Sequence, residues 1–200
     1  MSHVIGIDPG ITGGVAILSL DEEDAVPAVF PLPIRKHFSG RGNEIDASKL
    51  RELLLLECDV HDVDLCLIEH VGNMSRTEKG AGGEQQKIQN GATGMFNFGD
   101  TFGIIRSVCE LIGWEPIYKR PQVWQKAVLP KRIKSSGIQT GKTEIKKVAL
   151  SYVTRRFPTL TLTATRRCTT PHKGIVDAVC IAVYARELYW EISSPKMGTS

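Results

Sequence analysis

Long apolar runs are missing from this chain of 200 residues. None approaches the roughly 18 residues that a membrane-spanning helix needs, and the first residues lack the succession of basic, apolar and small residues that marks a secretory leader. We therefore expect no membrane association and a protein that stays in the cytoplasm. With 42% hydrophobic and 24% charged residues, the chain can form one globular domain with a substantial core.

Paired cysteines, repeats and linkers are also missing. The five cysteines are an odd number, include no Cys-x-x-Cys pair and lie mostly in apolar runs, which is typical of reduced core thiols. No internal repeat or interdomain linker is visible. The sequence predicts a single domain over residues 1–192 and a disordered tail over residues 193–200.

Acidic residues are nearly absent from one long segment. Between Lys119 and Lys173 there are 14 Lys and Arg residues and one acid, Glu144, so the segment carries +13 although the whole chain carries only +3. Such a segment can neutralise several phosphates and release their counterions, which favours binding to nucleic acid. The alternative is a solvated basic surface without a partner.

The rest of the chain is organised around its first strand and turn. The apolar run Val4–Ile7 predicts a buried strand, and it delivers Asp8 at the point where Pro9 and Gly10 force a turn. A second apolar run, Val15–Leu20, follows and predicts a hairpin. Taken alone, Asp8 could simply begin a turn.

Two further acids suggest a site. The apolar run Val63–Glu69 predicts a second strand that also ends in an acid, and Asp177 lies in the otherwise apolar helix expected from Gly174 to Ile192. If the two strands are parallel neighbours, Asp8 and Glu69 emerge at the same edge of the sheet. A buried acid is costly unless it is paired or binds a metal, and carboxylates suit Mg²⁺ or Mn²⁺. The alternative is that Asp177 caps its helix or faces solvent.

Apolar spacing and turn residues predict the remaining elements, and together they indicate an α/β fold with five strands. We expect most aromatic residues between 94 and 112 to lie in the core. The elements are a strand over Val26–Pro31, a loop over Arg35–Asn43, a helix over Ala47–Cys58 capped by Asp46, a long polar loop over Val71–Asn90, a helix from Gly94 to Ile112, a strand over Trp114–Lys119, a short helix from Pro121, a basic irregular segment over Pro130–Gly141, a basic helix over Lys142–Phe157 and a loop over Thr159–Thr170.

Three stretches together resemble the motifs of the RuvC-type Holliday junction resolvases. The similarity extends over about Val4 to Glu187, and it is greater to the phage-encoded branch of this family. The stretches are the turn Gly6–Gly13, the strand end Leu67–Glu69 and the helix start His172–Ala178, and the phage-encoded branch is further resembled at Met95–Gly99 and Pro121–Trp124.

The resemblance implies an RNase H-like fold, with a five-stranded mixed sheet flanked by helices. It implies a homodimer that cleaves four-way and other branched DNA by paired nicks, as in recombination and repair, in a bacterial or phage-infected cell. Asp8, Glu69 and Asp177 would be metal ligands for Mg²⁺ or Mn²⁺, with two ions per active site. Two ions would activate a water and stabilise the leaving oxygen of the phosphodiester.

The sequence departs from the family pattern at two places. An acid or histidine usually lies three residues before the last Asp of the site, but here that position is Gly174. His172 is a candidate substitute, as a metal ligand or as a catalytic acid or base, although a lone His near a helix start is unremarkable. Some relatives also place a stacking aromatic after the second acid, where this chain has His70–Met74. Strand separation could use Met74 or another loop residue instead.

Basic side chains near the predicted site are candidates for phosphate contacts. Their role would be to position the DNA and not to read its bases. The candidates are Lys142 and Lys146 in the basic helix, Lys131, Arg132 and Lys134 before it, and Arg76 and Lys79 in the long loop.

Other classes fit the sequence less well. The segment Gly137–Thr143 resembles a P-loop, but it has three residues between its glycines where the true motif has four. An actin-like or Hsp70-like ATPase begins with a similar turn but needs two such domains. An RNase H-like nuclease for another branched DNA or an RNA–DNA hybrid, and a non-catalytic DNA-binding subunit, stay open as alternatives.

Overall fold

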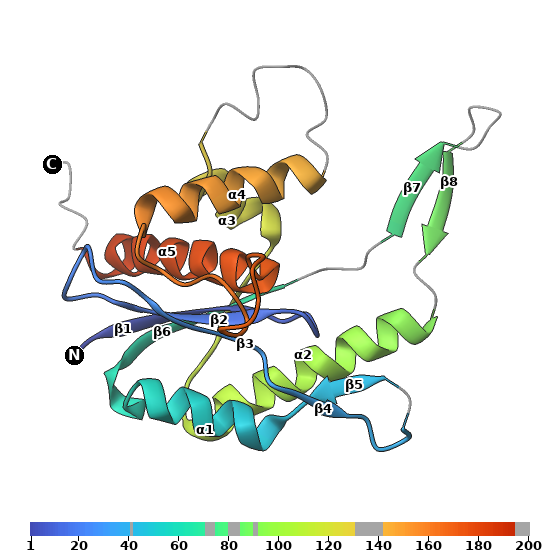
Figure 1. Ribbon diagram of the computed structural model, residues 1–200, viewed down its shortest axis with the longest axis horizontal. Helices are drawn as coiled ribbons and strands as arrows, with labels where there is room; N and C mark the ends of the chain where they lie inside the picture. Colours follow the sequence, from blue (N-terminus) through green and yellow to red (C-terminus); the bar gives the residue numbers. More distant parts are fainter. Residues whose placement is uncertain (41, 71–74, 80–84, 90–91, 131–141, 195–200) are drawn as a thin grey trace, which may run out of the picture.

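The computed structural model describes residues 1–40, 42–70, 75–79, 85–89, 92–130 and 142–194 (Figure 1). Its centre is one mixed sheet with the strand order β3-β2-β1-β6-β9. These strands are the five that the sequence predicts. Their bounds are His3–Asp8 for β1, Gly14–Ser19 for β2, Ala28–Pro31 for β3, Val63–Glu69 for β6 and Ile117–Lys119 for β9.

The pairing of the central strands confirms the expected arrangement. Strand β1 is antiparallel to β2 and parallel to β6, with Ile7 opposite Ile68. Because parallel strands end at the same edge of a sheet, Asp8 and Glu69 leave the sheet side by side. Strand β3 is an edge strand, as its flanking prolines predict.

Two helical layers cover the sheet (Figure 1). Alternate residues of each central strand face opposite layers, so that Val4 and Leu65 pack under one layer while Ile5 and Cys66 pack under the other. The first layer contains α3 (Pro121–Val128), α4 (Lys142–Arg156) and α5 (Lys173–Ser193), and the second contains α1 (Ala47–Glu57) and α2 (Ala92–Ile112). A short 3-10 turn, Val60–Asp62, precedes β6.

Helix α5 lies directly on the central strand β1. A Cβ atom at Gly6 would lie 2.3 Å from the backbone nitrogen of Ala182 and 2.5 Å from the carbonyl oxygen of Ala178. Only glycine in the strand and small residues on the helix permit this approach. The close contact fixes the start of α5, and hence Asp177, relative to the end of β1.

Two segments that the sequence predicts as loops contain hairpins instead. The two ends of the predicted loop 35–43 lie in β4 (Ile34–Lys36) and β5 (Asn43–Ile45), which pair antiparallel, while the described residues between them form no strand. A 2.7 Å hydrogen bond from Arg35 Nε to Glu44 Oε1 links the two strands. Cross-strand charge pairs can support a strand that shows no alternation of apolar residues, which is why the apolar pattern missed it.

The second wrong loop prediction covers Val71–Asn90. The described part of this segment contains β7 (Ser75–Lys79) and β8 (Gln85–Gln89), an antiparallel pair separate from the main sheet. Its glycine-rich centre in the sequence is equally compatible with a hairpin connection. Met74 lies outside the described residues.

Other predictions have mixed outcomes. Asp46 caps α1 by accepting a hydrogen bond of 3.0 Å from the backbone nitrogen of Lys49, as predicted. All five cysteines are free, and Cys168 is exposed while the other four are buried.

The prediction of core aromatics is wrong for Phe96, whose exposed fraction is 73%. Helix α5 extends to Ser193, the first residue of the predicted tail, and residues 195–200 lie outside the described part.

No helix within the described ranges combines the length and apolarity needed to cross a bilayer.

Candidate active site

Three carboxylates converge from three elements at one edge of the sheet. Asp8 ends β1, Glu69 ends β6, and Asp177 lies in the second turn of α5. All three are partly shielded from solvent. The negative charge of Asp8 acts on both of the other carboxyl groups. The structure therefore brings together the three acids that the sequence singled out.

The environment of these acids shifts their protonation. Burial, followed by the charge of Asp8, raises the pKa of Glu69 to about 7 and that of Asp177 to about 6. Burial also raises the pKa of Asp8, against the opposing effect of a hydrogen bond from the Gly10 backbone N–H. Asp8 Oδ1 accepts this hydrogen bond at 3.4 Å. Like charges held together in a shielded place favour a bound cation or proton.

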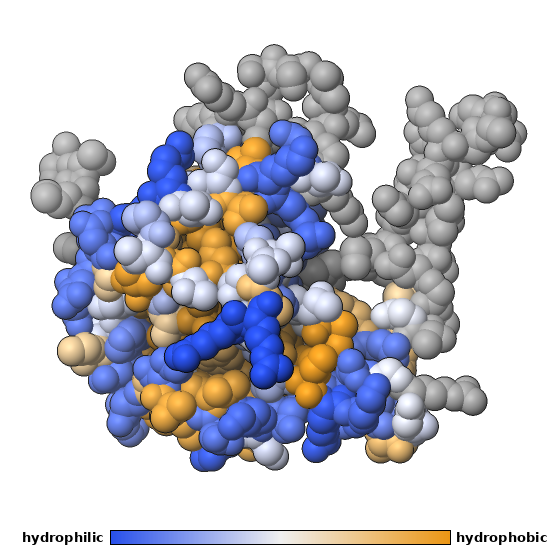
Figure 2. All heavy atoms as spheres, in the orientation of Figure 1, coloured by the Kyte–Doolittle hydropathy of each residue, from blue (hydrophilic) through white to orange (hydrophobic). Residues whose placement is uncertain are grey.

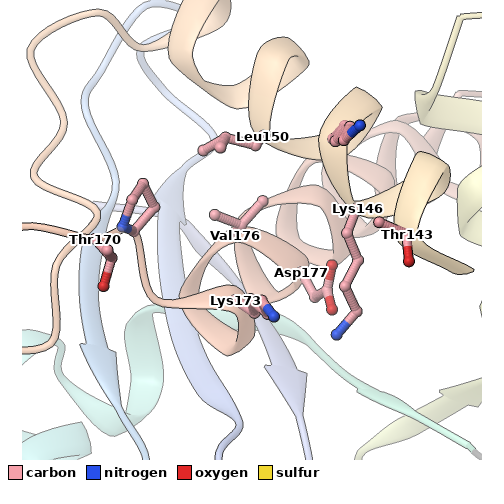
Figure 3. A pocket seen from close by; sticks show the side chains of 9 residues that line it. Thr143, Lys146, Leu150, Thr170, Lys173, Val176 and Asp177 are labelled. Atoms are coloured by element: carbon pink, nitrogen blue, oxygen red, sulfur yellow. The ribbon is translucent and has the colours of Figure 1, made fainter.

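Lys146 of α4 points toward the same place. Its positive charge lowers the pKa of all three carboxyl groups against the effect of burial. In Figure 3 its side chain lies beside the carboxylate of Asp177. The sequence predicts that Lys146 contacts a phosphate, but it does not show where Lys146 lies. In the structure Lys146 lies close enough to the three acids for its charge to act on each of them.

Trp124 contacts the cluster from a fourth element. Its indole Nε1 donates a hydrogen bond of 2.8 Å to Glu69 Oε2, and its side chain is only 1% exposed. Strand β9 pairs with the end of β6, Glu69 opposite Lys119, and α3 starts directly after β9. Sequence reasoning did not assign Trp124 to the site. A buried indole N–H needs a hydrogen-bond acceptor, so the sequence could have indicated that Trp124 has one. It could not have shown that this acceptor is Glu69.

His172 caps helix α5. Its Nδ1 accepts a hydrogen bond of 3.2 Å from the backbone nitrogen of Ile175, and burial lowers its pKa. With Nδ1 as the acceptor, the neutral ring carries its proton on Nε2. In this tautomer Nε2 can donate a hydrogen bond but cannot ligate a metal. This leaves Nε2 as a hydrogen-bond donor, which differs from the metal ligand and from the catalytic acid or base that the sequence predicts for His172.

The departure at Gly174 has a steric reason. The turn after β1 packs against the first turn of α5, and Gly13 pairs with Gly174 in an isolated bridge. A Cβ atom at Gly174 would lie 2.3 Å from the carbonyl oxygen of Thr12. No side chain, and therefore no fourth ligand, fits at this position in the present packing.

The donor set fits a hard divalent cation bound in part by substrate. Among the described residues, no three His, Cys, Asp or Glu side chains are close enough to enclose a metal ion by themselves. Mg²⁺ commonly takes one or two carboxylates, keeps several waters and uses phosphate oxygens for the rest of its shell. Asp8, Glu69 and Asp177 supply such carboxylates, and burial raises the pKa of each of them.

The other predicted DNA contacts are only partly described. Lys142 is the first residue of α4, and Arg76 and Lys79 lie in β7, where only the backbone is described. Three candidates lie outside the described residues, namely Lys131, Arg132 and Lys134.

Comparison with known proteins identifies the fold. No protein-family model matches the chain, and no curated protein sequence gives a significant match. The chain is similar to the structure of T. thermophilus RuvC in complex with Holliday junction substrate, with a TM-score of 0.51 and 18% identity over 94% of this chain and 96% of that one. A Thermus thermophilus RuvC structure matches with a TM-score of 0.47 and 16% identity, over 95% of each chain. The first likeness shows that this chain has the RNase H-like fold of RuvC, a mixed five-stranded sheet flanked by helices.

Proposed function

We propose that the protein is a divalent-metal-dependent endonuclease that resolves four-way DNA junctions by paired nicks. The observation that carries this proposal is the convergence of Asp8, Glu69 and Asp177, with the Lys146 charge acting on all of them, at one sheet edge. This cluster lies on a fold shared with a RuvC that was solved with a Holliday junction substrate.

Each residue of the cluster has a role in the proposed reaction. Asp8, Glu69 and Asp177 would hold two Mg²⁺ or Mn²⁺ ions, which supply an activated water and stabilise the leaving 3′ oxygen. Lys146 would neutralise charge on the phosphate under attack. His172 would donate from Nε2 to a phosphate oxygen, and Trp124 would hold Glu69 in orientation.

The basic segment supports a nucleic-acid substrate. The stretch from Lys119 to Lys173 contains α4 and carries +13. Contacts from its cations would fix the position of the backbone without reading sequence. The proposed phosphate contacts are Lys142, Lys146, Lys131, Arg132, Lys134, Arg76 and Lys79.

Paired nicks require two active sites, so we propose a homodimer. Near its start, helix α2 exposes two adjacent large apolar side chains: Met95 is 46% exposed and Phe96 73%. Exposed apolar side chains on one helix are typical of a surface that another chain covers. A second copy of this chain would bury them and supply the second site.

The nearest alternative keeps the chemistry and changes the substrate. The same carboxylate cluster suits cleavage of flaps or of RNA–DNA hybrids. A non-catalytic DNA-binding subunit is less well supported, because binding alone would not place three acids beside phosphate.

A substrate panel tests the proposal. A labelled four-way junction, a linear duplex, a flap and an RNA–DNA hybrid are incubated with the protein in Mg²⁺ or Mn²⁺, with Asp8→Asn as the control. We expect symmetrical nicks in the junction that the variant does not make. Cleavage of flaps or hybrids in preference to the junction would overturn the substrate assignment. Binding without cleavage of any substrate would overturn the enzyme assignment.

A further inference from the structure

A pocket of about 470 Å³ opens between α4 and the first turns of α5. Asp177 and Lys146, which belong to the carboxylate site, form part of its wall. Figure 3 shows the side chains of Lys146 and Lys173 on the two sides of the Asp177 carboxylate. The pocket is therefore continuous with the candidate active site but extends beyond it.

The walls of the pocket combine cations, hydroxyls and an apolar surface. Lys146, Lys147 and Lys173 contribute positive charge, and Thr143 and Thr170 contribute hydroxyl groups. Leu150 and Val176 form an apolar part of the wall. Figure 2 shows apolar side chains between hydrophilic ones over the region of α4 and α5.

This combination of groups matches one class of ligand. A nucleotide has an anionic phosphate that suits lysines and hydroxyls, and a sugar and base whose faces suit an apolar wall. A single phosphate ion would leave the apolar part of the wall uncovered. A strand that passes from the pocket to the carboxylates would cover both.

We propose that this pocket binds the DNA strand next to the bond that the carboxylates cut, with adjacent phosphates on Lys147 and Lys173. The proposal rests on the proposed function. It adds the path of the DNA strand, because it places the strand that flanks the cleaved bond between α4 and α5. Neither lysine was among the phosphate contacts predicted from the sequence.

Both lysines are available for a phosphate. Lys147 lies 3.9 Å from Glu144 Oε2, and both side chains are mostly exposed. Such a surface pair is weak, so a phosphate can replace it. Lys173 is exposed and is the first residue of α5, where the helix dipole adds to the attraction for a phosphate.

The test compares two double variants in the cleavage-deficient Asp8→Asn protein. Lys147→Ala/Lys173→Ala removes the two pocket cations. Lys36→Ala/Lys49→Ala is the matched control, because Lys49 also forms an exposed pair with an acid three residues away on its helix, Glu52. Lys36 and Lys49 lie in β4 and α1, away from α4 and α5 (Figure 1). Thermal melts confirm that both variants are folded.

Dissociation constants for a four-way junction are measured over a range of salt concentrations. We expect the pocket variant to bind about tenfold more weakly than its parent, with a salt slope reduced by about 2, because each lost phosphate contact removes about 0.9 from the slope. The control is expected to bind within about twofold of the parent. Neutral methylphosphonates placed one at a time beside the cleaved bond should weaken the parent at two adjacent positions and leave the pocket variant unaffected there.

The outcomes separate the two proposals. If the parent binds the junction and the pocket variant matches the control in affinity and slope, the pocket assignment is wrong and the proposed function stands. If the parent binds no DNA and the unsubstituted protein cleaves none, the proposed function fails, and the pocket assignment fails with it.

Discussion

The indole Nε1 of Trp124 donates a hydrogen bond of 2.8 Å to Oε2 of Glu69. This contact joins α3 to the end of β6 and leaves the other carboxylate oxygen of Glu69 available. The donor lies in a side chain that is 1% exposed, so its position is fixed by packing. Trp124 is thus a positioning residue for one of the three acids of the candidate site.

Loss of this hydrogen bond should change the metal dependence of cleavage. In Trp124→Phe the ring still fills most of the space, but Glu69 loses its donor. A hydrogen bond to a charged group contributes roughly 1.5–3 kcal/mol. We therefore expect the cleavage rate to fall by about tenfold or more and the Mg²⁺ concentration at half-maximal rate to rise. Cleavage rates over a Mg²⁺ titration measure both effects.

Trp114→Phe is the matched control for that experiment. Trp114 is also buried, and its Nε1 donates a hydrogen bond of 3.1 Å to the carbonyl oxygen of Val60. Val60 precedes the start of β6, whereas Glu69 is at the end of this strand. We expect this variant to lose stability without changing the Mg²⁺ requirement. An equal Mg²⁺ requirement in both variants would show that Trp124 acts through stability alone.

The raised pKa of Glu69 predicts how stability depends on pH in metal-free protein. Burial and the Asp8 charge raise this pKa from 4.5 to about 7. Because the folded-state pKa is the higher one, the stabilising effect of protonation is complete below pH 4.5 and is lost as pH rises through about 7. Removing the charge should therefore stabilise the protein above that pH.

Melting curves of Glu69→Gln test whether loss of this charge stabilises the protein at high pH. The glutamine still accepts from Trp124 but carries no charge. At a pH near 8 we expect it to be more stable than the unsubstituted protein by on the order of 2 kcal/mol, which raises the melting temperature by roughly 4–8 °C. Near pH 4 the difference should vanish. Glu115→Gln, at an exposed position, should show no such change, and a lower melting temperature for Glu69→Gln at pH 8 would contradict the account.

Divalent metal should stabilise the protein through the same acids. A ligand at about 100 times its dissociation constant adds about 2.7 kcal/mol. We expect Mg²⁺ or Mn²⁺ to raise the melting temperature near pH 8, and to do so less near pH 5, where protons compete for the carboxylates. EDTA should reverse the effect. A shift of the same size in Asp8→Asn would place the metal elsewhere.

Gly174 is expected to resist any side chain. In Gly174→Ala the added carbon would meet the carbonyl oxygen of Thr12 at 2.3 Å, so we expect a loss of roughly 2 kcal/mol or more. Gly99→Ala in α2 has open space around its Cβ and should gain up to about 1 kcal/mol. Chemical denaturation measures both. Equal effects would show that the turn after β1 yields to a side chain at position 174.

The sequence predicts much of the fold because apolar runs determine the central strands. The apolar run Val4–Ile7 is followed by Asp8, the largely apolar run Val63–Glu69 ends in Glu69, and parallel pairing then brings Asp8 and Glu69 together. The hairpins β4–β5 and β7–β8 have no such apolar pattern. They depend on strand pairing and, for β4–β5, on the link between Arg35 and Glu44, which spacing does not reveal.

The parts of the site that the sequence does not predict depend on tertiary packing. Trp124 meets Glu69 because β9 pairs with β6 and turns directly into α3. Lys146 acts on the acids because α4 packs beside α5. In the sequence Phe96 resembles a core residue because it is apolar. Apolar character alone does not show whether the side chain is buried in its own chain or lies on the surface.

The proposed function requires that Asp8, Glu69 and Asp177 form a metal-dependent site and that two such sites act on one junction. A supercoiled plasmid carrying an extruded cruciform tests it most directly, because two nicks at one junction give linear DNA and a single nick gives an open circle. We expect linear plasmid with Mg²⁺ and none with EDTA or with Asp177→Asn. Open circles alone would contradict paired cleavage, and linear plasmid from Asp177→Asn would contradict the assignment of the active site.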